Sequence, residues 1–139
     1  MRLWFCTLEY FPQKNKDEII LTVVFIHLKT VKMKREQLIS ILGNCINACN
    51  HCADACLDEP NVQHMATCIR TDHVCAEVCS SLSQILHTKY KNVEGLVRYC
   101  ISVCKDCKAT CEGHDHDHCK ACAKACDECI RACEAFLAA

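Results

Sequence analysis

Hydrophobic and polar residues follow a helical period from about residue 34 to the end of the chain. Cysteine, alanine and aliphatic residues recur at steps of three and four with polar residues between them, which is the pattern of amphipathic helices. Capping and turn residues interrupt the pattern three times. We therefore predict four helices. The first spans about 34–57, and the second runs from the acidic start at Asp58, Glu59 and Pro60 to about Thr88. The third runs from the N-cap Asn92 to Glu112, before Gly113, and the fourth from about His118 to Leu137.

The connections between these helices are short, so sequential helices run antiparallel. The predicted fold is all-α, an antiparallel up-down-up-down four-helix bundle over residues 33–139. Residues 1–32 differ from the rest: they hold a single cysteine, Cys6, and the ten-residue apolar run 19–28, which is too short to span a bilayer. We expect an N-terminal appendage there, either a short hairpin or an extra helix, or a leader upstream of a start at Met33.

Cysteines occupy the inward-facing stripe of each predicted helix. Steps of four, three and four recur in CINACNHCADAC, CISVCKDCKATC and CAKACDECIRAC, and the second helix keeps three of the four places, with Asp72 at the other. Side chains at these steps share one helical face. The repeat predicts a bundle core lined with sulfur, formed by Cys45, Cys49, Cys52, Cys56, Cys68, Cys75, Cys79, Cys100, Cys104, Cys107, Cys111, Cys122, Cys126, Cys129 and Cys133, with Cys119 beside them.

Composition favours free thiols over disulfides. The 139 residues include 17 cysteines but only three Gly and two Pro, fewer turn residues than loop-rich disulfide folds use. Cysteines one turn apart have Cβ atoms about 5–6 Å apart, whereas a disulfide needs about 3.8 Å. The N-terminus shows neither a cleavable signal nor a twin-arginine pair, so we expect a cytoplasmic protein with reduced thiols. The net charge of −1 indicates neither nucleic acid nor an anionic membrane as a partner.

A core of small thiols buries less apolar surface than a leucine core, and metal binding would supply the missing stability. Soft thiolates in excess select Cu(I), and each C-x3-C pair on one turn can supply two ligands. We predict many Cu(I) ions per chain, held by the fifteen cysteines of the stripes and by Cys119, with His64 and His118 as further ligands. An iron–sulfur or redox electron carrier and a zinc-binding or metal-detoxifying thiolate protein remain alternatives.

Asp72 and the other histidines receive weaker interpretations. We expect the Asp72 carboxylate to stay solvated or to pair with a basic neighbour, and do not assign it to metal. His51 and His73 are interpreted as surface residues beside the stripe. His64 lies four residues before Cys68 and is placed on the stripe itself.

One end of the predicted bundle gathers exchangeable ligands. The first and third connections lie at the same end of an up-down-up-down bundle. Histidine, methionine and cysteine there suit a place where copper arrives or leaves, so we expect the entrance among Cys56, His64, Met65, Cys111, His114, His116, His118 and Cys119.

The segment from about Met33 to Ala139 resembles the cysteine-rich four-helix-bundle copper storage proteins, in particular their cytosolic branch. The motifs that carry the resemblance are CINACNHCADAC, HVCAEVC, CISVCKDCKATC and CAKACDECIRAC. The resemblance implies a bundle that fills with Cu(I) along its axis, assembles into homotetramers, and stores copper that a chaperone or chelator loads. No nucleophile–base–orienter set indicates an enzyme.

Overall fold

The computed structural model describes residues 15–21 and 33–139. The chain divides into two units, Met1–Val31 and Lys32–Ala139. In the first unit, residues 16–21 are helical. Cys6 and most of the appendage for which we expected a hairpin or a helix lie outside the described residues.

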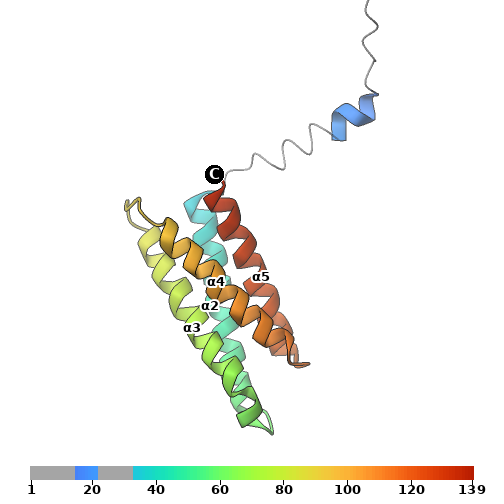
Figure 1. The fold of residues 1–139 in the computed structure, drawn as a ribbon, viewed down its shortest axis with the longest axis vertical. Helices are drawn as coiled ribbons and strands as arrows, with labels where there is room; N and C mark the ends of the chain where they lie inside the picture. Colours follow the sequence, from blue (N-terminus) through green and yellow to red (C-terminus); the bar gives the residue numbers. More distant parts are fainter. Residues whose placement is uncertain (1–14, 22–32) are drawn as a thin grey trace, which may run out of the picture. The chain divides into compact units, whose positions relative to one another are not determined.

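The second unit is the predicted four-helix bundle (Figure 1). The helices are α2 (Arg35–Leu57), α3 (Val62–Leu86), α4 (Glu94–Glu112) and α5 (Asp117–Leu137). The described parts of the chain contain helices and no strand, which confirms the all-α prediction. Among the described residues, no helix combines the length and the apolar character that a bilayer crossing requires.

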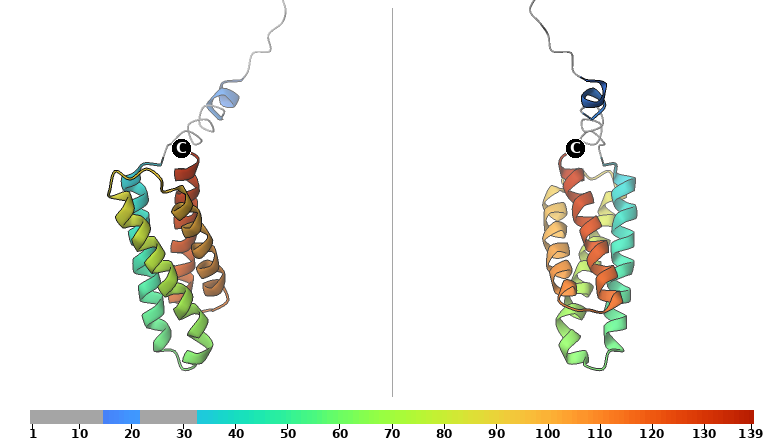
Figure 2. Two further views of the ribbon diagram at one scale, coloured as in Figure 1. Left: turned by 60° about the vertical axis from the view of Figure 1, so that its left-hand side comes forward. Right: turned by 90° about the vertical axis from the view of Figure 1, so that its right-hand side faces the viewer.

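The four helices form a square around one axis (Figure 2). Each helix packs against two neighbours, in the order α2, α3, α4, α5, and α5 closes the square against α2. Sequential helices are antiparallel. The cysteines of every stripe are fully buried, so each stripe faces the axis that the four helices enclose.

Two helix starts differ from the sequence prediction. The turn at Asp58, Glu59 and Pro60 is the connection itself, and α3 begins at Val62, where the Asn61 side chain accepts a hydrogen bond from the backbone N–H of His64 at 3.2 Å. Asn61 therefore caps this helix, as an Asn side chain commonly does.

The start of α4 is the second difference. Asn92 does not cap this helix, because Val93 occupies the cap position without a side-chain cap bond. Val93 is buried, so apolar packing fixes the start of α4. The α4 helix ends before Gly113, as predicted, and α5 begins one residue earlier than predicted, at Asp117.

The end of the bundle at the α3–α4 connection is closed by aliphatic packing. Arg35 secures this closure, since its guanidinium donates to the backbone carbonyls of Thr88 at 2.8 Å and Tyr90 at 2.7 Å. The residues that fill the axis at this end are all buried and are Leu38, Leu42, Leu82, Leu86, Val93 and Val97. The opposite end carries the other two connections, residues 58–61 and 113–116, and ends in cysteine, methionine and histidine.

Candidate metal centre

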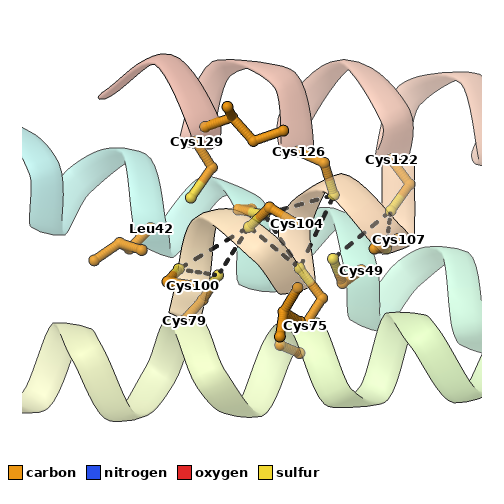
Figure 3. Packing of buried hydrophobic residues seen from close by; sticks show 14 of the residues in the cluster. Leu42, Cys49, Cys75, Cys79, Cys100, Cys104, Cys107, Cys122, Cys126 and Cys129 are labelled. Atoms are coloured by element: carbon orange, nitrogen blue, oxygen red, sulfur yellow. Dashed lines mark hydrogen bonds between the residues drawn. The ribbon is translucent and has the colours of Figure 1, made fainter. Parts of the chain in front are cut away.

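The sixteen cysteines of the described bundle are free thiols, and each is 0% exposed. Their sulfur atoms point from all four helices into the space along the axis (Figure 3). This arrangement confirms the cysteine-lined core predicted from the four-three-four steps. Cys119, which lies outside the strict repeat, also belongs to the core, because its sulfur lies 3.8 Å from that of Cys52.

The spacing between sulfur atoms suits metal ions better than disulfides. Contacting sulfurs lie from 3.5 Å apart, between Cys68 and Cys111, to 4.0 Å apart, between Cys45 and Cys75. With a metal–sulfur bond of about 2.3 Å, sulfurs lie about 4.0 Å apart around a trigonal ion and about 3.8 Å apart around a tetrahedral one. The metal-free core therefore already holds its sulfurs near the separations that a shared ion requires.

The thiols form overlapping groups of four along the axis. Within each group the sulfur atoms lie within 4.8 Å of one another, and several groups share members, such as Cys79 and Cys104. Sulfurs that belong to two groups can bridge two ions, so the column suits clusters of several ions. The groups include Cys52, Cys56, Cys68, Cys119; Cys49, Cys107, Cys122, Cys126; Cys45, Cys75, Cys79, Cys104; and Cys79, Cys100, Cys104, Cys129.

Hydrogen bonds between thiols shift their acidity in both directions. Hydrogen bonding to Cys111, followed by the contacts with Cys68 and His118, lowers the pKa of Cys52 to about 5 against the opposing effects of Cys122 and burial. Hydrogen bonding to Cys107 raises the pKa of Cys49. A thiol with a lowered pKa is more readily available as a thiolate, the form that binds metal. The Cys52 thiol, close to the histidine-bearing end, therefore gives up its proton to a metal ion more readily than an ordinary thiol.

Asp72 is fully buried inside the sulfur column, contrary to the expectation that it stays solvated or meets a basic residue. The thiols of Cys107, Cys122 and Cys111 donate to its Oδ1 at 3.1, 3.3 and 3.5 Å, and that of Cys68 donates to its Oδ2 at 3.7 Å. Burial, followed by the contact with Cys107, raises the pKa of Asp72 to about 12. The raised pKa favours the neutral carboxylic acid, the form that can occupy a buried cysteine position without an unpaired charge.

His118 connects the thiol column to the outside. Its Nδ1 lies 3.4, 3.5 and 3.9 Å from the sulfurs of Cys119, Cys52 and Cys56. Its Nε2 lies 2.9 Å from Oε1 of Glu59. Burial lowers the pKa of His118, but the hydrogen bonds to Cys52 and Glu59 outweigh burial and raise it. The structure thus brings His118 to the cysteines with which the sequence analysis grouped it.

The structure corrects the placement of His64 on the cysteine stripe. Its side chain is exposed, and its ring packs edge-on against that of His114, with the ring centroids 5.2 Å apart. The stripe instead continues through Met65, which is 1% exposed, because the position preceding Cys68 in the four-three alternation lies three residues away. His51 and His73 are exposed, as predicted.

Sequence reasoning missed Glu59 as part of the metal centre. Its carboxylate is only 22% exposed and contacts ring nitrogens of both His116 and His118. The only sequence signal was its position in a connection at the same end as the histidines. Asp72 had a clearer signal, because the four-three-four steps already placed it on the buried face.

Taken together, the fold and the thiol column define a helical-bundle protein that holds several soft metal ions along its axis. The sequence model of the copper storage protein family matches residues 31–138, and the chain belongs to this family.

Individual relatives agree with this assignment. The chain is 38% identical over 103 residues to the uncharacterized cysteine-rich protein YhjQ of Bacillus subtilis, covering 74% of this chain and 95% of that protein. The Cu(I)-bound copper storage protein BsCsp3 superposes with a TM-score of 0.69 at 38% identity, covering 73% of this chain and 95% of that one. A cytosolic copper storage protein from Streptomyces lividans, with five coppers, gives a TM-score of 0.72 at 41% identity, covering 76% and 92%.

Proposed function

We propose that this protein stores many Cu(I) ions in the cytoplasm, bound by the thiolates of its sixteen buried cysteines and, at one end, by His118. The observation that carries the proposal is the overlap of the four-sulfur groups, whose shared members can bridge neighbouring ions. The Cu(I)-bound and copper-loaded relatives support Cu(I) as the cargo, and the cytosolic relative supports the compartment.

The ligand chemistry favours Cu(I) over zinc or an iron–sulfur cluster. Structural zinc sites are closed sets of four ligands, whereas the groups here share members along the axis. Iron–sulfur proteins hold discrete clusters and show strong visible absorption. Soft thiolates in a continuous column match the preference of Cu(I).

A metal-exchange experiment separates these candidates. The reduced protein is loaded with zinc, and Cu(I) is then added without oxygen while released zinc is measured with a chromophoric dye. We expect Cu(I) to displace all of the zinc without producing a strong visible band. Retention of zinc against excess Cu(I) would instead favour a zinc-binding role, and a strong visible band after reconstitution with iron and sulfide would favour an iron–sulfur carrier.

His114 and His116 of the α4–α5 connection, together with His118 in the first turn of α5, are proposed as the copper entrance. The far end of the axis is filled by buried residues such as Leu38 and Leu86, so ions enter more easily at the end where His118 meets the thiols. His64 and His114, whose rings touch, extend this entrance outward.

A variant with His114, His116 and His118 all changed to Asn is expected to take up Cu(I) from a chelator at least about tenfold more slowly, because the ligands for exchange are gone. Stopped-flow absorbance measures the rate. The number of Cu(I) ions bound at saturation should fall by no more than the number that His118 contacts. The control replaces the exposed His51 and His73 by Asn. Equal rates in the triple variant and the wild type would exclude this connection as the entrance.

The homotetramer that the family resemblance implies, and loading by a chaperone or chelator, belong to this same proposal. Light scattering of the full chain would show the oligomeric state, with a mass about four times 15.7 kDa expected. The family is one of metal storage, and we propose no catalytic reaction for this chain.

A further inference from the structure

Glu59 joins the two connections at the histidine-bearing end of the bundle. It lies between α2 and α3, and both histidines that it contacts lie more than fifty residues later in the chain. Its Oε1 lies 3.1 Å from Nδ1 of His116 and 2.9 Å from Nε2 of His118. The two rings are stacked, with centroids 5.2 Å apart and planes within 10°. A single carboxylate oxygen therefore meets different nitrogens of two parallel imidazoles.

The hydrogen-bond chemistry of a carboxylate restricts what each ring can present. An ionised carboxylate has no proton to donate, so Nε2 of His118, which is hydrogen-bonded to it, carries the hydrogen. Its negative charge also repels a ring lone pair, so Nδ1 of His116, 3.1 Å away, is the nitrogen of that ring that carries the hydrogen. In a neutral imidazole the other nitrogen then holds the lone pair that can bind a metal ion. For His116 this nitrogen is Nε2, and for His118 it is Nδ1, the atom that faces the thiols of Cys52 and Cys119.

We propose that Glu59 is a positioning residue that holds His116 and His118 in opposite tautomers. His118 thereby offers Nδ1 to an ion at the first thiol group, while His116, whose side chain is 40% exposed, offers Nε2 to an ion arriving from outside. The stacked rings then present two acceptor nitrogens in succession, and a Cu(I) ion passes from the more exposed ring to the ring beside the thiols. The transfer step rests on the proposed storage function, whereas the tautomer assignment does not.

The arrangement fits a recurrent feature of metal sites. Histidine ligands usually donate their second ring N–H to a carboxylate, which fixes the ring orientation and the tautomer. His118 has both parts, with Glu59 on one nitrogen and sulfur atoms around the other. Its side chain is 12% exposed, so few solvent contacts compete with this orientation.

The test of the tautomers uses the metal-free full chain with 15N-labelled histidine. Long-range 1H–15N spectra at alkaline pH, where both rings are neutral, distinguish the two tautomers. We expect the Nδ1–H form for His116 and the Nε2–H form for His118. In Glu59→Ala both rings should become tautomer mixtures. In Glu59→Gln both forms should persist, because the amide oxygen can still accept the N–H bond of His118 and still faces Nδ1 of His116. Asp58→Ala, a loss of the same charge one residue away, should match the wild type.

Two results would overturn the assignment. One is the reverse tautomer of either histidine in the wild type, and the other is unchanged tautomers in Glu59→Ala. The circular dichroism of each variant, compared with the wild type, shows whether the bundle is intact. These readouts need no copper, so they remain decisive even if the storage function itself proves wrong.

The transfer step has its own measurement. Uptake of Cu(I) from a chelator by Glu59→Ala is expected to be about tenfold slower than by the wild type, the size of effect typical of an outer-shell partner. Glu59→Gln should restore most of the rate, and the number of ions bound at saturation should stay the same. An unchanged rate in Glu59→Ala would contradict the transfer step. Failure of the wild type to bind many Cu(I) ions would instead contradict storage.

Discussion

Loading the reduced protein with Cu(I) is expected to raise its thermal midpoint by at least about 20 °C, the largest effect that the structure predicts. Each ion held at a thousand times its dissociation constant contributes about 4 kcal/mol to stability. Several ions together therefore exceed the stability of a typical small domain, which is about 5–15 kcal/mol. In a bundle of this size, 1 kcal/mol shifts the midpoint by about 4 °C.

The structural reason is the composition of the core. Between the aliphatic end at Leu38 and Leu86 and the end at Met65, the axis is filled mainly by thiols, which bury less apolar surface than leucines would. Differential scanning calorimetry of the apo and loaded forms, without oxygen, measures the shift. A chelator should reverse it. A rise of only a few degrees at full loading would show that the ions do not bind the folded core.

Asp72 is expected to make the metal-free protein less stable as the pH rises, and Asp72→Asn is expected to remove this contribution. The pKa of Asp72 is raised to about 12 in the folded protein from an ordinary value of 3.8. Between these values the folded protein holds a proton that the unfolded chain has released. Stability contributed by this group is thus fully present below its unfolded pKa and is lost as the pH rises, by about 1.4 kcal/mol per pH unit.

Urea unfolding of the reduced apo-protein at pH values between about 5.5 and 8 measures this slope. Across that range the Asp72 contribution to the free energy of unfolding should fall by about 3 kcal/mol. Cys52, whose pKa is lowered, acts in the opposite direction, and His118, whose pKa is raised, acts in the same direction. Both contribute in the two proteins alike, so the difference between wild type and Asp72→Asn reports Asp72. We expect the variant to be the more stable of the two at pH 8. The exposed Asp54→Asn is the control. A slope that is equal in wild type and Asp72→Asn would mean that this carboxyl is ionised in the core.

The sequence predicted the bundle and its sulfur core because both depend on local periodicity. Steps of four, three and four place Cys45 and Cys56 on one face of α2 whatever the rest of the chain does, and short connections leave few arrangements for four such helices. The same rule also implied that Asp72 faces inward. Periodicity says nothing of protonation, however, and the raised pKa of Asp72 follows mainly from the burial that the packed bundle imposes.

Other features depend on how the helix ends meet in space. His64 and Met65 are adjacent in sequence, and the phase of the stripe decides which of them enters the core. The contact of Glu59 with His116 and His118 joins connections more than fifty residues apart, so no local pattern contains it. Val93 replaces Asn92 as the cap of α4 because its burial at the aliphatic end outweighs the capping preference of Asn.

The storage function is tested most directly by an anaerobic titration of the reduced metal-free protein with Cu(I), in competition with a chromophoric Cu(I) chelator. The sixteen buried thiols predict that the protein withdraws copper stoichiometrically until it holds about one ion for every one or two cysteines, with no strong visible band. Saturation at about one to four ions, as expected for a closed zinc site or a single cluster, or an affinity no greater than that for zinc, would contradict storage.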